Sequence, residues 1–181
     1  MKKRVMCAVL TSVAVATAAA SALWAANTDG IGLRARLTGF QEVPPKLTQS
    51  TGQFTATIDP TRNSITFFLR YTALSTPVLF AHIHFAQRGV NGGIMMFLCN
   101  NTSTGPQPRP CPSPDGTVTG TLTAQDVIGP GPNNPATDQG ITPGNLRQAI
   151  RAMLSGATYV NVHSQRWPAG EIRGKINVVR R

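Results

Sequence analysis

Short runs in which apolar and polar residues alternate recur along the 181-residue chain, separated by stretches rich in proline, glycine and asparagine. Alternation with a period of two places every second side chain on one face, so each run predicts a half-buried β-strand. Strands do not alternate with helices along the chain, which argues against a parallel α/β sheet. We therefore expect an all-β fold, an antiparallel β-sandwich or Greek-key barrel with one short helix. The predicted strands span residues 33–37, 52–58, 64–71, 78–85, 94–99, 116–122, 158–163 and 171–179.

One amphipathic helix is predicted before the strand at 158–163. Thr142 can cap its first turn with Pro143 at the first helical position, and Gly156 can end it. Thr123 and Asp126 also predict a short capped helical turn. The apolar positions of the main helix recur every three or four residues, at Leu146, Ala149, Ile150, Met153 and Leu154.

The N-terminal segment has the pattern of an export signal. Lys2, Lys3 and Arg4 precede an uninterrupted apolar and small-residue run over 5–20, and small residues at 18–22 and Ala26 offer cleavage sites. We expect residues 1–26 to be a signal peptide, residues 27–181 to form a single domain, and the protein to be secreted or periplasmic. An uncleaved signal anchor is the alternative, and no membrane span is expected after cleavage.

The chain is strongly basic, with 17 Lys and Arg against 7 Asp and Glu. Removing residues 1–26 takes three basic residues from the net charge of +10 and leaves +7. Such a surface favours acidic partners, and for an exported protein these are an anionic polysaccharide or a protein partner. The alternative is a solvated basic surface with no specific partner. We expect no nucleic-acid binding, because the basic residues are dispersed and do not interleave with aromatic residues. Two strand faces are expected to be exposed and to bind polyanions weakly: Arg34 with Arg36, and Glu171 with Arg173 and Lys175.

Cys99 and Cys111 remain after cleavage, and an even pair in an exported protein predicts one disulfide. The bridge would pin the proline-rich stretch 100–110 and contribute at most about 3 kcal/mol for so short a loop. A metal site built on the two cysteines is the alternative, although their spacing lacks the Cys-x-x-Cys arrangement of such sites.

All three histidines lie in predicted strands, His82 and His84 in one and His163 in another. Residues two apart share a strand face, so His82 and His84 point the same way, and His163 joins them if the strands are neighbours. Three neutral imidazoles suit copper or zinc. Asn161, on the face of His163, and Glu171 are candidates to orient the imidazoles through hydrogen bonds. The alternative is a set of half-buried core histidines that bind no metal.

Other chemistry has weaker support in the sequence. Met95 or Met96 could add a thioether that favours Cu(I), as in a periplasmic copper carrier, and core packing is the alternative for both. The sequence shows no Ser-His-Asp order, catalytic cysteine, paired carboxylates or phosphate-binding loop, so no catalytic residues are assigned.

Several segments resemble the CHRD (chordin) domain family. The resemblance covers roughly residues 33–178, with Ser164 where the family more usually has threonine and with an insertion at 100–113. It is carried by 38–45, 81–84, 89–92 and 159–164, and most specifically by the closing Pro-Ala-Gly-Glu-Ile-Arg-Gly at 168–174.

The resemblance implies an exported immunoglobulin-like or superoxide-dismutase-like β-domain, which in bacteria usually occurs alone. We therefore expect a non-enzymatic binding module in the cell envelope or extracellular space that can hold a transition metal through its histidines. The alternatives are a copper-dependent redox enzyme resembling superoxide dismutase and a periplasmic copper carrier. Family membership alone does not decide between them, because one fold serves many functions.

Overall fold

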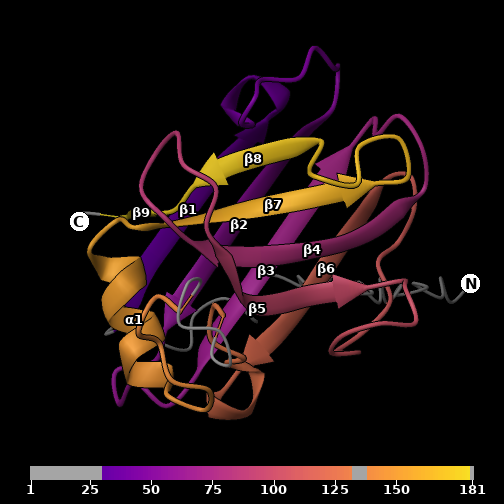
Figure 1. Ribbon diagram of the computed structural model, residues 1–181. Helices are drawn as coiled ribbons and strands as arrows, with labels where there is room; N and C mark the ends of the chain where they lie inside the picture. The colour runs from indigo at the N-terminus through magenta and orange to yellow at the C-terminus, as the bar shows by residue number, and fades with distance from the viewer. Residues whose placement is uncertain (1–29, 132–137, 180–181) are drawn as a thin grey trace, which may run out of the picture.

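The computed structural model describes residues 30–131 and 138–179, and within them nine strands form one antiparallel sheet (Figure 1). The strands are β1 (Ile31–Thr38), β2 (Thr51–Ile58), β3 (Ile65–Thr72), β4 (Val78–Phe85), β5 (Gly93–Asn100), β6 (Gly116–Leu122), β7 (Thr158–Ser164), β8 (Ile172–Lys175) and β9 (Asn177–Val178). Their order across the sheet is β5-β4-β7-β8-β1-β2-β3-β6, with β9 paired to β1. The predicted signal peptide, residues 1–26, lies outside the described residues.

The sheet folds over on itself into two layers, which cross in Figure 1. The back layer holds β1, β2, β3 and β6, and the front layer holds β4, β5, β7 and β8. Thr38 of β1 pairs with Arg173 of β8 where the layers join. The predicted strand at 171–179 divides at Ile176, so that β8 pairs with β7 and β9 pairs with β1. The all-β antiparallel prediction is confirmed, in a barrel-like form.

The back layer is buried on one face, as alternation predicts. Buried and exposed side chains alternate along β1, β2 and β3, and Leu33, Phe54 and Leu69 belong to the core between the layers. Burying one such side chain contributes about 1.5–3 kcal/mol, so a one-residue slip of register would be costly. Arg36 and Arg70 lie on the outer face.

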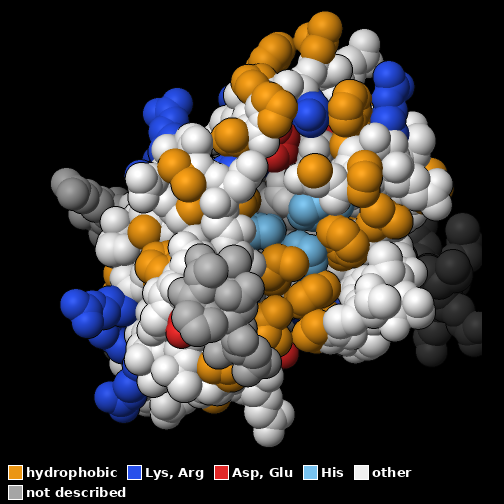
Figure 2. Space-filling model, viewed as in Figure 1, with side chains coloured by type: hydrophobic (Ala, Val, Ile, Leu, Met, Phe, Trp, Pro, Cys, Tyr) orange, Lys and Arg blue, Asp and Glu red, His pale blue; other side chains and the backbone are white. Residues whose placement is uncertain are grey.

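The front layer is buried on both faces, which the alternation did not predict. Every residue of β7 is buried, and so are residues 81–84 of β4. Ile83 and Val160 pair across these strands and belong to the core, whereas His82 and Asn161 pair on the outer face. Figure 2 shows the histidines at the floor of a hollow on this face, with hydrophobic side chains around them.

Loops cover part of the outer face of the front layer. Asn91, between β4 and β5, donates a 3.1 Å hydrogen bond to the carbonyl of Val43 and accepts a 2.9 Å bond from Arg173. The prediction that Glu171, Arg173 and Lys175 form an exposed strand face is therefore wrong. Glu171 and Arg173 are 0% and 3% exposed, because loops from elsewhere in the chain lie over them.

Helix α1 (Leu146–Leu154) buries most of the predicted apolar stripe. It begins later than expected, because Asn145 and not Thr142 is the N-cap, and its side chain accepts a backbone N–H bond from the first turn. Gly144 has a φ of 78°, a left-handed conformation that interrupts helical geometry ahead of the cap. Gly156, with a φ of 72°, ends the helix as predicted.

Short helical turns complete the fold. The turn at Ala124–Asp126 has the predicted capping box, in which Thr123 and Asp126 satisfy each other's backbone groups. A second turn at Gly39–Gln41 follows β1 and leads to the buried Glu42. Within residues 30–131 and 138–179, none of the helices is long and apolar enough to cross a membrane.

Candidate metal centre

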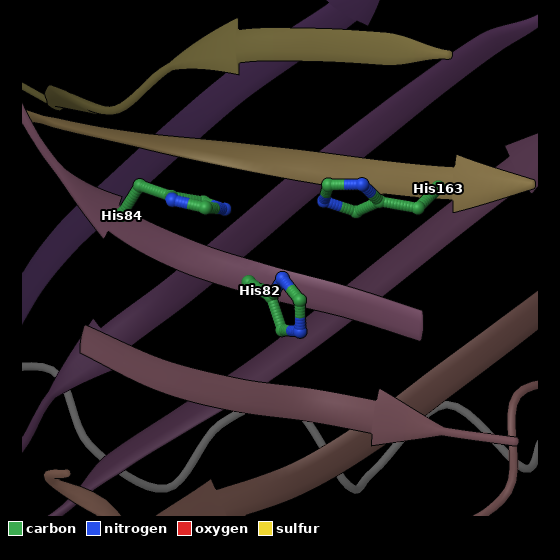
Figure 3. Close-up of side chains that lie close together, drawn as sticks. All are labelled: His82, His84 and His163. Atoms are coloured by element: carbon green, nitrogen blue, oxygen red, sulfur yellow. The ribbon is translucent and has the colours of Figure 1, made fainter. Parts of the chain in front are cut away.

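Strands β4 and β7 bring the three histidines together on the outer face of the front layer, as the sequence predicted. His163 pairs with Phe80, so it lies diagonally across from His82. The ring centroid of His82 lies 5.0 Å from that of His163 and 5.4 Å from that of His84. The centroids of His84 and His163 are 6.1 Å apart. In Figure 3 the rings of His84 and His163 point toward each other, and His82 lies below the gap between them.

Hydrogen bonds occupy one ring nitrogen of His84 and one of His163, and neither ring nitrogen of His82. Nδ1 of His84 lies 3.0 Å from the carbonyl oxygen of Gly92, and Nδ1 of His163 lies 2.9 Å from that of Pro168. A carbonyl oxygen only accepts, so both Nδ1 atoms carry the proton and both Nε2 atoms present a lone pair. Both Nε2 atoms, and both ring nitrogens of His82, are buried without a hydrogen-bond partner.

Burial keeps the three imidazoles neutral. Desolvation lowers the pKa of His84 to about 4 and the pKa of His163 to about 3, although the bonds to backbone carbonyls favour the charged form. Desolvation, followed by the neighbouring histidines, lowers the pKa of His82 further still. Neutral imidazole is the form that coordinates a metal, so protons compete for these nitrogens only at acidic pH.

Aromatic side chains form the walls of the cluster. Phe80 stacks on His82 with ring centroids 4.6 Å apart, and Phe97 meets the same ring edge-on at 4.2 Å. Tyr159 stacks on His84 at 4.7 Å with the two planes within 2° of parallel. These contacts fix the positions of the imidazoles without using their nitrogens.

Two buried charged residues that sequence reasoning missed lie next to the cluster. The guanidinium carbon of Arg173 is 3.4 Å from the centre of the Tyr159 ring, a cation–π contact. Desolvation raises the pKa of Glu42 to about 7, although the nearby Arg173 charge favours its ionised form. Both residues belong to the CHRD-like segments of the sequence, which is the feature that could have identified them.

Asn161 lies on the outer face with the histidines but does not orient them by a hydrogen bond, contrary to the prediction. Its side-chain amide donates to Oε1 of Glu42 and, at 3.4 Å, to the carbonyl of Ile172. The bonds that hold His84 and His163 come from loop carbonyls instead, because the loops reach the ring nitrogens that point away from the cluster.

Glu171 likewise has another role than orienting an imidazole. Its Oε1 accepts hydrogen bonds from the hydroxyls of Ser50 and Thr48, at 2.6 and 3.0 Å, and from the backbone N–H of Ser75 at 3.0 Å. Glu171 itself lies in the turn between β7 and β8. One buried carboxylate therefore ties together the β1–β2 connection, the β3–β4 loop and that turn.

Met95 and Met96 do not extend the cluster. Met96 pairs with Ile83, whose side chain faces the core, and Met95 is fully buried in the same core cluster. The core-packing alternative for both methionines is therefore the one the structure supports. The group that could hold an ion in the described part of the chain consists of imidazoles alone.

The cluster fits a transition metal after a small closure. Three imidazole nitrogens that share one ion at about 2.0–2.1 Å lie about 3.3–3.6 Å from one another. The candidate ligand atoms here lie within 4.8 Å of one another, so each needs to move inward by less than about 1 Å. Three fixed imidazoles can hold an ion for storage or transfer, or leave a further position open for a ligand.

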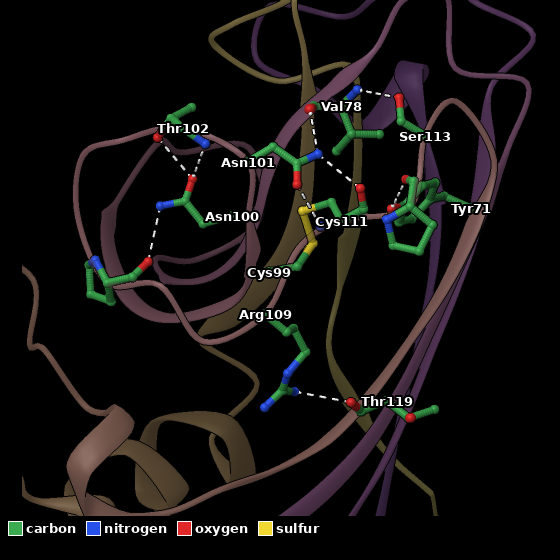
Figure 4. Close-up of a disulfide and its surroundings, with 12 residues drawn as sticks. Tyr71, Val78, Cys99, Asn100, Asn101, Thr102, Arg109, Cys111, Ser113 and Thr119 are labelled. Atoms are coloured by element: carbon green, nitrogen blue, oxygen red, sulfur yellow. Dashed lines mark hydrogen bonds between the residues drawn. A yellow bond between two sulfur atoms is a disulfide. The ribbon is translucent and has the colours of Figure 1, made fainter.

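The predicted disulfide between Cys99 and Cys111 is present, with a sulfur–sulfur distance of 2.08 Å. Figure 4 shows it at the base of the proline-rich loop, where the side chain of Asn101 donates to the carbonyls of Val78 and Cys111 and accepts from the backbone N–H of Cys111. The bridge and these bonds fix the loop to β4 and β5. Joined in this way, the two cysteines provide no thiolate for a metal.

Comparison with known proteins agrees with the resemblance seen in the sequence. Residues 33–176 match the CHRD domain family. No match was found among curated proteins or among solved structures, so a specific likeness to immunoglobulin or superoxide dismutase domains stays a prediction. The family match includes all three histidines, both missed charged residues and most of the 181-residue chain. The chain therefore belongs to the CHRD domain family.

Proposed function

We propose that this CHRD domain is an exported, non-enzymatic binding protein that holds one copper or zinc ion between His82, His84 and His163. The observation that supports this most is the set of buried, unpartnered imidazole nitrogens that lie close to one another. An unpartnered buried polar atom costs about 1–3 kcal/mol of stability. One ion would give a partner to a nitrogen of each ring at the same time.

A purely structural role would be expected to arrange these residues differently. Buried polar atoms in a core are normally all hydrogen-bonded. His84 and His163 each use one nitrogen on a backbone carbonyl, and their other nitrogens lie close to the shared centre. A metal-binding imidazole is typically held in this way, with the carbonyl fixing the tautomer and the ring orientation.

Two features support export to an oxidising compartment. Residues 1–26 have the pattern of a signal peptide, and the bridge between Cys99 and Cys111 is of a kind that persists outside the reducing cytoplasm. We therefore propose that the mature domain, residues 27–181, is secreted or periplasmic. The intact mass of protein recovered from the envelope or the medium should place its N-terminus between residues 21 and 27. A full-length mass would instead indicate an uncleaved anchor.

Titration calorimetry of the metal-free protein with Zn(II) and Cu(II) tests the metal site. We expect one ion per chain with a Kd below about 10 µM, equivalent to about 7 kcal/mol. His84→Ala and His163→Ala should abolish binding, whereas Gln53→Ala, an exposed change on the back layer, should leave it unaltered. If neither ion binds, the cluster holds neither Zn(II) nor Cu(II). If binding survives both histidine substitutions, the bound ion lies elsewhere.

The same samples distinguish a binding protein from a redox enzyme or a carrier. A copper enzyme resembling superoxide dismutase would dismute superoxide once loaded. We expect no activity above that of the metal-free protein, because the candidate ligand nitrogens are buried. Transfer of bound copper from the protein to a competing chelator within minutes would indicate a copper carrier.

We also propose that the outer face of the back layer binds an anionic polysaccharide. Arg34, Arg36 and Arg70 are exposed on it, and the sequences of β1, β2, β3 and β6 contain no Asp or Glu. Arg36 and Arg70 flank Gln53 on adjacent strands and line a shallow depression of about 300 Å³. Adjacent strands are about 4.8 Å apart, so the two arginine backbones are about 10 Å apart and their charges can meet successive charges of an extended polyanion.

Salt elution from a heparin column tests this face, because binding between exposed charges weakens as salt rises. The double variant R36Q/R70Q should elute at lower salt than the wild type. The matched variant R147Q/R151Q removes the same charge from the exposed side of α1 and should elute later than R36Q/R70Q. Equal elution of the two variants would mean that net charge, and not this face, governs retention.

A further inference from the structure

We propose that the three-histidine site holds copper as three-coordinate Cu(I) in preference to Cu(II) and Zn(II). The inference rests on the proposed metal-binding function of His82, His84 and His163, and it adds which ion and which oxidation state the site selects. Three features carry it: the neutral ligand set, a nearby buried cation and the exclusion of water.

The ligand set is neutral. The group that could hold an ion in the described residues contains three histidines and no Asp, Glu or Cys. A bound ion therefore keeps its full charge in a buried site. The electrostatic cost of removing an ion from water rises with the square of its charge, so a dication costs about four times as much as a monocation of similar size. Imidazole binds both copper and zinc, and Cu(I) is the singly charged ion of this set.

A buried cation adds to this cost. Arg173 is 3% exposed and packs on the ring of Tyr159, which in turn stacks on His84. Its positive charge disfavours further positive charge at His84. The carboxyl group of Glu42 interacts with Arg173 and offsets part of this charge when it is ionised. Glu171 is held away from the cluster, where hydroxyl and backbone donors of two other loops bind its Oε1. A doubly charged ion meets about twice the repulsion from Arg173 that a singly charged ion meets.

Water exclusion favours three ligands over four. His82 is 1% exposed, and the rings of Phe80 and Phe97 pack against it at 4.6 and 4.2 Å. Zinc completes a three-histidine site with a water or an anion in the fourth position. A closed-shell Cu(I) ion is satisfied by three nitrogens in a plane and needs no such ligand. An apolar surround also stabilises the less charged state of a bound metal.

Anaerobic competition on the wild-type protein measures the preference directly. Cu(I) is supplied with the chromophoric chelator bicinchoninate, and Cu(II) and Zn(II) are supplied with nitrilotriacetate. We expect Cu(I) to bind about a hundredfold more tightly than either dication. For copper that ratio raises the one-electron reduction potential by about 118 mV relative to the unbound ion. Equal or tighter binding of a dication would overturn the Cu(I) preference and leave the metal site intact, whereas failure of all three ions would overturn both.

A matched pair of variants tests the charge argument. Ile94 pairs with His84 on the same face of the front layer and is only partly buried, so a polar replacement is tolerable there. Ile94→Asp places a carboxylate beside the ligands, and Ile94→Asn places a side chain of the same shape without the charge. The Asp variant should show a Cu(I) preference about tenfold smaller than the Asn variant. Equal preferences in the two variants would overturn the proposal that charge selects the ion.

Discussion

Replacing His82 with leucine should stabilise the metal-free protein while removing its metal site. His82 is 1% exposed, and neither of its ring nitrogens has a hydrogen-bond partner. Leucine has a similar volume and no polar side-chain atom, and Phe80 and Phe97 already surround the position with apolar surface. The expected gain is informative because most substitutions of buried residues destabilise a protein.

The magnitude follows from the two unpartnered nitrogens of His82. Each costs about 1–3 kcal/mol, so their removal contributes about 2–6 kcal/mol. Imperfect fit of a side chain of similar volume offsets up to about 1.5 kcal/mol of that gain. We therefore expect the free energy of unfolding to rise by about 0.5–6 kcal/mol. At about 3 °C per kcal/mol for a domain of this size, the Tm should rise by roughly 2–18 °C.

Urea unfolding in the presence of a chelator measures the difference, and equal m-values would show that both proteins expose the same surface on unfolding. His84→Leu is the matched control. This substitution removes one unpartnered nitrogen but also leaves the carbonyl of Gly92 without its donor. The free energy of unfolding should therefore rise little or not at all. If His82→Leu lowers stability by more than about 1 kcal/mol, the nitrogens of His82 have partners in solution and the reasoning fails.

Four further outcomes follow from the buried groups and the disulfide. Because burial lowers the pKa of His84 to about 4 and that of His163 to about 3, calorimetry should show metal affinity unchanged from pH 8 to about 5 and falling below about 4. Urea unfolding should show the metal-free protein losing stability as pH falls below about 6.5, since unfolded histidine takes up protons that the folded site excludes. Glu171→Ala should lower the unfolding free energy by about 1–3 kcal/mol, because it removes the acceptor of the buried Ser50 hydroxyl, of the Thr48 hydroxyl and of the Ser75 backbone N–H. The double variant C99A/C111A should lose no more than about 3 kcal/mol in the same assay, and a larger loss would mean that the bridge does more than close a short loop.

The strands and the meeting of the histidines could be predicted because both follow from local alternation. Once residues 78–85 form a strand, His82 and His84 must share a face, and His163 has the same geometry in its own strand. What alternation could not supply was the pairing of β4 with β7, since strand order depends on long-range contacts. The concentration of every histidine in these two strands made that pairing the informative hypothesis.

The burial of the outer face of the front layer could not be predicted from the alternation of polar and apolar residues. Arg173 alternates with apolar neighbours and so has the pattern of an exposed residue, yet Asn91, from a loop about 80 residues earlier, lies against it. The role of Glu171 could not be predicted from the sequence for a related reason. It belongs to the turn before β8, and its partners come from loops near Ser50 and Ser75. Local periodicity carries no information about which loop will cover which face.

Because the outer face of the front layer is buried, the unpartnered histidine nitrogens lower the stability of the metal-free protein. A bound ion and a leucine at position 82 would each remove that loss of stability by different means. An ion present at a hundred times its Kd stabilises the folded state by about 2.7 kcal/mol, which lies within the gain expected of His82→Leu. The two effects cannot add, because the variant lacks a ligand. Copper or zinc should therefore raise the Tm of the wild type by several degrees and leave that of His82→Leu unchanged. An equal rise in both proteins would place the bound ion elsewhere on the surface.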